Sequence, residues 1–520
     1  MLKTTNLKFK LLGIIPQFSD KTGELNPEQI SALSALLTFK GKSVKGLLKE
    51  TLDKGQNLDK KVRIILNKSS LRGHASVATT PTLAFSFEAS KFLDSMLTGI
   101  VFSSSLMASG RRTDTNEQDI VYPTAIRKNK KALDLYKKQS IENLECQNWL
   151  LSKGVAKDEA SKILQYGIYG TGIMVLPVES LVGFVKEWEM EKEWMPEEAE
   201  ILISLFKKEL NKLGINQLFY SRQVAPRDVY PYPNIFKNPQ KSNLARETKK
   251  EGVVSLDFIK TKELLKLLKT LNSLTQKISS SKTKILKEWP KLLSLRRQIC
   301  RDYNLAVNIK VLSNVSWRVW GEKKRHRTVP QTVDSIYFSI AKAIGEIQSL
   351  KSKTKNLVQS AKLINKYDKC FSIPTSIRKN PHYLKRYLKC FMGSLDCYEK
   401  LVKMGIKPGD AVFVIPRGIR IKVLQEFNLF NLISGYYPLR LCTTAEEQLR
   451  AATRQEADVI KKTLKKKKFS ELAEAMAVKC QTTCFCHEEN NCGQIRKLVN
   501  NYDKEFHKKM LGSLEERAYK

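Results

Sequence analysis

One stretch of the sequence decides how the fold is interpreted. It reads Ser316-Trp-Arg-Val-Trp-Gly-Glu-Lys-Lys-Arg325-His326-Arg327-Thr-Val-Pro-Gln-Thr-Val-Asp-Ser335-Ile-Tyr337. Three consecutive cationic or titratable side chains cannot all face one apolar core, so Arg325-His326-Arg327 forms either a solvated turn or a ligand-binding ridge. Trp317, Trp320 and Tyr337 can supply apolar walls beside it. Arginine forks next to aromatic faces suit planar anionic ligands such as nucleotides and flavins. On these residues alone, both interpretations stay open.

A second stretch has the same layout. It reads Ser90-Lys-Phe-Leu-Asp-Ser-Met-Leu-Thr-Gly99-Ile-Val-Phe-Ser-Ser104-Ser-Leu-Met-Ala-Ser109-Gly110-Arg111-Arg112 and aligns with 316–338 without a gap. Ser90 then matches Ser316 and Ser109 matches Ser335, each 226 residues later. A repeat at a fixed offset indicates internal duplication.

Both stretches resemble the signature of the flavin-dependent thymidylate synthases, Arg-His-Arg-x-x-Ser-x-Asn-x-x-Ser-x-Arg-Tyr. The second copy keeps Arg-His-Arg, while the first keeps Ser104 and Ser109-Gly110-Arg111. The resemblance implies an α+β fold, helix-rich overall, in which two domains of this family follow in tandem, each an antiparallel sheet with packed helices. We expect one domain over 1–240, a linker over 241–255 and a second domain over 256–520 with a cysteine-rich segment at 480–492.

Another pair of blocks supports the repeat. The run Gly154-Val-Ala-Lys-Asp-Glu-Ala is matched 251 residues later by Gly405-Ile-Lys-Pro-Gly-Asp-Ala. Downstream, the second half has Asn428 and Leu439-Arg440 in a block similar to the family's pyrimidine-binding segment, whereas Trp188 stands about where the first half would carry that arginine. The two halves have therefore kept different parts of the family pattern.

The resemblance also assigns roles to individual residues. Arg325, His326, Arg327 and Asn428 would bind FAD. Ser109, Gly110 and Arg111 would hold the phosphate of dUMP, and Arg440 would contact its uracil ring. The implied reaction is reductive methylation of dUMP to dTMP with methylenetetrahydrofolate as carbon donor and NADPH as reductant, without a protein nucleophile.

Family enzymes are homotetramers whose sites gather residues from several subunits. A chain with two halves would then form a homodimer that resembles the family tetramer. Because each half keeps what the other has lost, the resemblance suggests one complete site shared between the phosphate loop of the first half and the cationic motif of the second.

Composition sets wider bounds. The chain has 520 residues and a formal net charge of +39, which attracts polyanions but does not name one. A non-catalytic nucleotide-binding relative, and a basic nucleic-acid-binding protein on the same scaffold, therefore remain alternatives. The start of the chain alternates polar and apolar residues instead of forming a signal peptide, and no apolar run reaches the ~18–20 residues that span a bilayer. We expect a cytoplasmic protein without a membrane segment.

Four of the ten cysteines are close together in the sequence: Cys480, Cys484, Cys486 and Cys492, with His487 between them. Thiolate and imidazole ligands suit tetrahedral zinc, although the spacing is not that of a standard finger. Structural zinc, reduced or paired thiols and an iron–sulfur cluster all remain open.

Local patterns predict individual elements. We expect a strand at the N-terminus and another over 76–89, where residues alternate. Helical spacing predicts helices from Pro27 to Leu37 with Asn26 as N-cap, and over 124–153, 264–278, 340–363 and 383–404.

Overall fold

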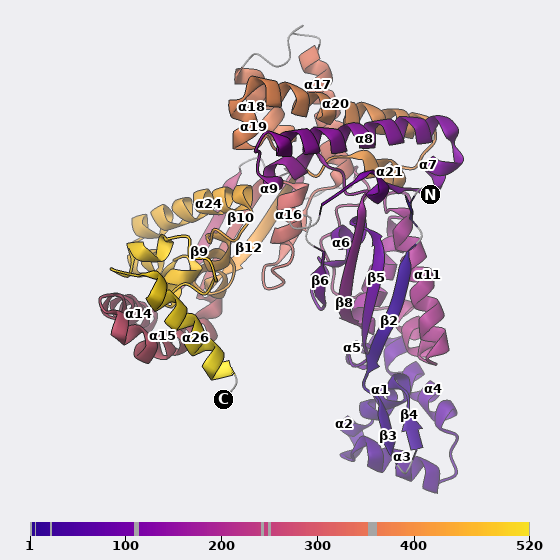
Figure 1. The fold of residues 1–520 in the computed structure, drawn as a ribbon. Helices are drawn as coiled ribbons and strands as arrows, with labels where there is room; N and C mark the ends of the chain where they lie inside the picture. Colours follow the sequence, from indigo (N-terminus) through magenta and orange to yellow (C-terminus); the bar gives the residue numbers. More distant parts are fainter. Residues whose placement is uncertain are drawn as a thin grey trace. The chain divides into compact units, whose positions relative to one another are not determined.

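The computed structural model describes residues 3–5, 7–20, 23–108, 114–240, 244–247, 251–351 and 361–518. They form two compact units (Figure 1). Unit 1 comprises Met1–Lys241, Ser316–Arg327 and Ser335–Arg420, and unit 2 comprises Ser242–Val315, Thr328–Asp334 and Ile421–Lys520. The Arg-His-Arg motif therefore belongs to unit 1, although it lies beyond residue 255 in the sequence. The domain bounds predicted from the sequence stay a prediction about which segments of the chain are repeated.

The main sheet of unit 1 has four antiparallel strands in the order β2-β5-β8-β6. Their bounds are β2 Lys8–Ile15, β5 Thr82–Ser90, β8 Tyr169–Pro177 and β6 Ser104–Met107. Alternate residues of β5 are buried, as expected for a strand with one covered face. Phe85 packs edge-on against Phe206 of helix α11 (Glu197–Lys212), so this helix covers part of that face.

Two long helices of unit 1 pack side by side in Figure 1. They are α8 (Lys130–Ser152) and α20 (Pro381–Lys403). Asn143 Nδ2 donates to Ser394 Oγ at 3.0 Å. Trp149 near the end of α8 contacts Tyr383 near the start of α20, with ring centroids 5.4 Å apart, so the helices are antiparallel. Unit 1 thus combines segments from both halves of the sequence.

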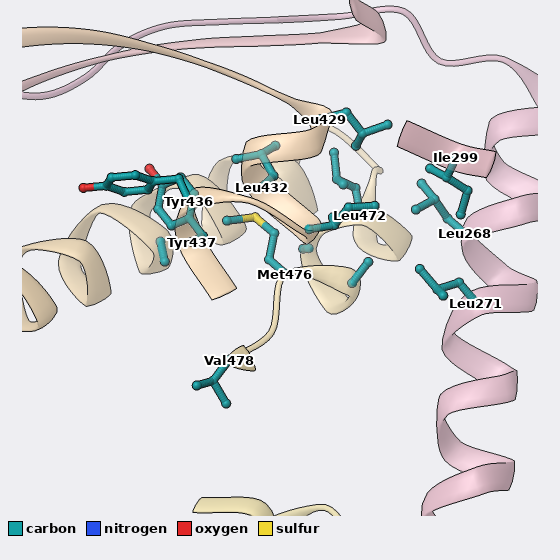
Figure 2. Close-up of a cluster of buried hydrophobic side chains, with 14 of the residues drawn as sticks. Leu268, Leu271, Ile299, Leu429, Leu432, Tyr436, Tyr437, Leu472, Met476 and Val478 are labelled. Atoms are coloured by element: carbon teal, nitrogen blue, oxygen red, sulfur yellow. The ribbon is translucent and has the colours of Figure 1, made fainter. Parts of the chain in front are cut away.

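Unit 2 has its own four-stranded sheet in the order β9-β10-β12-β11. The bounds are β9 Gly252–Phe258, β10 Val307–Ser316, β12 Arg420–Asn428 and β11 Gln331–Val333. Helices α14 (Lys262–Ser279) and α15 (Lys282–Tyr303) pack against each other beside this sheet. Figure 2 shows Leu268 and Leu271 of α14 facing Leu472 and Leu429 in the core of the unit.

The two sheets have the same strand order, and several elements recur in register. Helix α8 and strand β8, of 23 and 9 residues, reappear 251 residues later as α20 and β12 with the same lengths. One side-chain bond recurs with them: Tyr136 Oη donates to the carbonyl of Val121 at 2.8 Å, and Tyr387 Oη donates to that of Ser372 at 2.8 Å. The sequence repeat that links Gly154 to Gly405 and this repeat in architecture therefore share the offset of 251 residues.

The predicted fold class is confirmed at the level of a helix-rich α+β chain with antiparallel sheets. Helix α1 (Pro27–Ala35) has the predicted Asn26 cap, whose side chain accepts from Gln29 N. The strand predicted over 76–89 is wrong at its start, because Ser76–Thr79 form the short helix α5 and the strand begins only after Pro81. Proline lacks the backbone N–H that would continue a helix, so α5 ends before Pro81.

The helix predicted over 124–153 is broken at Asn129, which caps α8 by accepting from Ala132 N and so separates it from α7 (Thr124–Lys128). The helices predicted over 264–278 and 383–404 are confirmed as α14 and α20. The helix predicted over 340–363 corresponds to α17 (Ile336–Lys351), and 352–360 lie outside the described residues.

Further elements of the described chain complete the two units. They are β1 (Lys3–Thr4), β3 (Phe18–Asp20), β4 (Gly23–Leu25), β7 (Val121–Tyr122), α2 (Leu37–Lys40), α3 (Val44–Asp53), α4 (Leu58–Lys68), α9 (Lys157–Ala160), α10 (Val178–Met190), α12 (Asn216–Gln223), α13 (Leu244–Glu247), α18 (Ala361–Cys370), α19 (Thr375–Lys379), α21 (Pro408–Ala411), α24 (Glu447–Lys466), α25 (Ser470–Ala475) and α26 (Lys504–Ala518). None of the described helices combines the length and the apolar character that a membrane crossing requires.

Candidate functional site

Helix α16 (Trp317–Lys323) positions the Arg-His-Arg motif. Ser316 is its N-cap, because the hydroxyl accepts from Val319 N at 3.2 Å. Trp317 and Trp320 are fully buried, and Trp317 Nε1 donates to Ser95 Oγ at 3.1 Å. The two tryptophans therefore belong to the core that supports the motif, and they do not form the ligand walls that the sequence suggested.

The cationic loop, Lys324–Arg327, packs against the first copy of the signature within unit 1. Arg325 Nη2 donates to both carboxylate oxygens of Asp94, at 3.1 and 3.2 Å. Arg327 Nε donates to the carbonyl of Ile100 at 3.2 Å, and its Nη2 donates to Ser105 Oγ at 3.3 Å. Ile100 is the residue that aligns with His326. The two copies of the motif are thus in direct contact.

Lys324 is a buried residue that also takes part in the contact between the two copies of the motif. Its Nζ donates to the carbonyls of Asp94 and Ser95 at 2.6 and 2.9 Å, and burial lowers its pKa to about 7. Burial raises the pKa of Asp94, but the positive charges of Arg325 and Lys324 outweigh this and lower the pKa overall. Asp94 therefore remains an anion that holds Arg325 in place.

A cleft of about 770 Å³ runs along the sheet of unit 1 and is bordered by all four strands and by Arg325. We call it the β-sheet cleft. Its cations are Lys8, Lys10 and Arg325, and its acid is Glu88, which accepts from Lys8 Nζ at 3.0 Å and from Tyr169 Oη at 2.7 Å. The volume lies within the range of small-molecule sites, and the excess of cations favours an anionic ligand.

The predicted phosphate-binding residues Ser109, Gly110 and Arg111 lie outside the described residues. The described chain reaches Ala108, which follows β6 and lines the β-sheet cleft. A ligand in that cleft would therefore contact β6, the strand that precedes Ser109 in the sequence.

Asn428 and Arg440, the other two predicted ligand contacts, belong to unit 2. Asn428 caps helix α22 (Leu429–Ile433), because its side-chain oxygen accepts from Asn431 N at 3.1 Å. Arg440 is half-buried at the end of α23 (Tyr436–Arg440). The capping bond gives Asn428 a structural role that the sequence comparison did not predict.

The cysteine-rich segment also lies in unit 2. Cys480, Cys486 and Cys492 line one small cavity together with Cys442, whereas the thiol of Cys484 donates to the carbonyl of Thr275 at 3.7 Å. Within the described part of the chain, no group of three or more His, Cys, Asp or Glu side chains has the arrangement of a metal site. Burial raises the pKa of Cys480 and Cys484 to about 12, which keeps both thiols protonated at neutral pH.

Sequence reasoning missed Asp94, Lys324 and the two cleft lysines. Asp94 and Arg325 are 231 residues apart, and an ion pair at that separation has no local signal in the sequence. Lys8 and Lys10 could have been found, since residues two apart on a strand share a face. They would have indicated a basic strip along the first strand.

Comparison with known proteins shows which family part of this chain resembles. Residues 306–464 match the family model described as thymidylate synthase complementing protein. This segment contains the whole of the cationic loop as well as Asn428 and Arg440. The resemblance to the flavin-dependent thymidylate synthases is therefore confirmed over residues 306–464, which match the model of that family.

Two curated relatives are flavin-dependent thymidylate synthases. The chain is 31% identical to the one from Thermococcus onnurineus over 83 residues, which are 16% of this chain and 34% of that protein. It is 31% identical to the one from Pyrococcus horikoshii over 121 residues, which are 23% of this chain and 49% of that protein. The chain thus spans between a third and a half of the length of these relatives.

One solved structure that overlaps the chain is a UMP/dUMP methylase, PolB from Streptomyces cacaoi, bound with 5-Br dUMP. The overlap covers 44% of this chain and all of that one, at 13% identity and a TM-score of 0.34. A likeness of that size supports no conclusion about the present chain.

Proposed function

We propose that this protein is a flavin-dependent thymidylate synthase, which methylates dUMP to dTMP with methylenetetrahydrofolate as carbon donor and NADPH as reductant. The observation that carries the proposal is that Arg325, retained from the family motif, lines a cation-rich cleft of about 770 Å³. FAD, when bound, supplies the hydride-transfer chemistry, and the protein supplies binding and orientation.

The contacts and the exposure of the cationic loop support FAD binding. Asp94 engages Nη2 of Arg325, while the guanidinium also borders the β-sheet cleft, so the fork is oriented before a ligand arrives. The side chain of Arg325 is 39% exposed, so an anionic group can reach it. Arg327 is held by Ile100 and Ser105 and orients the other end of the loop. A pre-oriented, exposed guanidinium suits a diphosphate or flavin ring.

We further propose that the chain arose by tandem duplication and that its halves share one site. The equal strand order of the two sheets and the common offset of 251 residues support the duplication. Contact between the cationic loop and the first copy of the motif supports the sharing, because it brings Arg325 to the strand that precedes Ser109, Gly110 and Arg111. Arg440 would contact the pyrimidine, Asn428 the flavin, and two chains would form a homodimer.

The first test is the visible absorption spectrum of the purified chain with FAD, followed by titration with dUMP. We expect a bound-flavin spectrum that dUMP perturbs. Arg325→Ala should weaken FAD binding by more than tenfold, since losing a charge-assisted contact costs on the order of 1.5–3 kcal/mol. Arg63→Ala, which removes an exposed arginine of α4, is the matched control and should bind FAD like the wild type.

A second variant separates ligand binding from folding. Asp94→Asn breaks the same ion pair as Arg325→Ala but leaves the guanidinium in the cleft. If Arg325 contacts FAD, Asp94→Asn should change FAD affinity by less than about threefold. Equal losses in both variants would show that the pair only stabilises the fold. A wild-type chain that ignores FAD would overturn the proposed function and leave a non-catalytic relative.

Structural zinc held by Cys480, Cys484, Cys486 and Cys492 stays a prediction from the sequence. The described residues do not favour it, because the thiol of Cys484 contacts α14 and no three His, Cys, Asp or Glu side chains there stand in metal-site geometry. Zinc content of the purified chain, measured by mass spectrometry, tests it. A metal-free wild type would contradict the prediction.

A further inference from the structure

A second cleft, of about 500 Å³, lies entirely within unit 2. Its walls come from α15, from the α22–α23 segment and from the turn that begins at Lys479. We call it the α15 cleft. Its volume is that of a site for a small molecule. The cationic loop and the β-sheet cleft take no part in it.

The central residue of this cleft is Arg296 on α15. Its side chain lines the cleft although the residue is only 4% exposed. Nη1 donates to the carbonyl of Ile433 at 2.9 Å, whereas Nε is buried without a hydrogen-bond partner. Burial lowers the pKa of Arg296 to about 10, so the group is still a cation at neutral pH. A buried guanidinium normally has an anion beside it.

None of the described residues that line the α15 cleft is acidic, so the lining itself supplies no such anion. The other cations at its rim include Arg301, which pairs with Asp302 at 2.6 Å, and Lys479, which pairs with Glu488 at 2.7 Å. Both of these acids lie outside the lining. The positive charge of Arg296 therefore faces the cleft uncompensated, with exposed Arg297 one residue further along α15.

The rest of the lining suits a ligand with an apolar part. Phe430 and Leu439 form one wall, and Leu293 of α15 is 38% exposed. Ser434, Thr483 and His487 border the same space with polar side chains. A cationic end beside an apolar wall matches a phosphate group attached to a ring.

We propose that the α15 cleft binds a small phosphate-bearing molecule, with its phosphate paired to Arg296 and its apolar part against Phe430 and Leu439. The lining of this site shares no residue with that of the β-sheet cleft, and the proposal does not depend on the proposed thymidylate synthesis. A charge-assisted pair between guanidinium and phosphate is the strongest hydrogen-bonded contact that these side chains can offer.

Calorimetric titration of the full chain in 0.15 M NaCl tests the proposal, with pyrophosphate and AMP as probes. AMP binding tighter than pyrophosphate would show that the apolar wall contributes, and the reverse order would show that the phosphate alone is recognised; both support the site. We expect Arg296→Lys to weaken binding by about tenfold, because a point charge cannot reproduce the fork. Arg297→Glu, an exposed change, should weaken it at least fivefold by charge reversal.

A matched variant locates the binding. Arg454→Glu reverses an exposed arginine of α24 outside the α15 cleft and should leave the affinity for pyrophosphate unchanged. Failure of the wild type to bind either probe would overturn the proposal, and Arg296 would then serve only to cap α22. Binding that Arg296→Lys and Arg297→Glu leave unchanged would overturn it as well.

Discussion

Two loops in equivalent places differ in chemistry. After β5 the chain reads Gly99-Ile100-Val101, with Ile100 5% exposed, and after β10 it reads Arg325-His326-Arg327, with the Arg325 side chain 39% exposed. Both loops lie in unit 1 and touch each other through Arg327 and Ile100. Two cationic copies in contact would repel, because like charges a few ångströms apart interact unfavourably. The comparison shows that the two loops can pack against each other because one of them is cationic and the other is apolar.

Introducing a positive charge into the first loop should have the largest effect, because it would remove the difference between the two loops. Ile100→Arg would bury a guanidinium beside Arg327, without an acid of its own. We expect a loss of roughly 3–5 kcal/mol in the free energy of unfolding, the range for an unpaired buried charge. Urea denaturation measures it. Phe102→Arg is the control, since Phe102 is 58% exposed, and should cost less than about 1 kcal/mol.

Equal destabilisation by Ile100→Arg and Phe102→Arg would show that the first loop tolerates charge. The apolar replacement would then have no part in holding the two copies together.

A second difference concerns the serines that begin the two motifs. Ser316 accepts a hydrogen bond from Val319 N, whereas Ser90 donates through its amide to Glu198 Oε1 at 2.9 Å and through its hydroxyl to Oε2. Burial raises the pKa of Glu198 to about 7. The first half therefore carries a pH-sensitive contact where the second half carries a helix cap.

Glu198→Gln should remove that pH dependence. Because the pKa of Glu198 is higher in the folded than in the unfolded chain, its contribution is present below about pH 4.5 and is lost as the pH rises to about 7. The wild type should therefore lose stability over this range relative to Glu198→Gln, by on the order of 3 kcal/mol in total. Thermal unfolding of both proteins at pH 5, 6, 7 and 8 measures the difference. Parallel curves would contradict the buried, protonated carboxyl.

The sequence predicted what is local or repeated. Periodicity located α14, a cap located α1, and the repeated motif indicated related sheets, since each signal lies within one stretch of chain. It could not predict that Trp317 and Trp320 are core residues or that Asp94 holds Arg325, because these contacts join segments over 200 residues apart. Cys484 shows the same limit: its spacing suited a metal ligand, but its contact with Thr275 depends on how α14 packs.

The smallest expected effect compares the N-caps of α1, in the first half, and α14, in the second half. Asn26 forms a capping box at α1, where its side chain accepts from Gln29 N at 2.8 Å and Gln29 Oε1 accepts from Asn26 N. Thr261 at α14 accepts only from Leu264 N, at 3.1 Å. Asn26→Ala should cost about 1–2 kcal/mol and Thr261→Ala about 0.5–1 kcal/mol, since the box satisfies two backbone groups and the single cap one. Asn26→Ser and Thr261→Ser keep a capping oxygen and should recover most of each loss in urea denaturation. A larger loss at Thr261 than at Asn26 would mean that packing of α14 in unit 2, and not the cap, limits the stability of that helix.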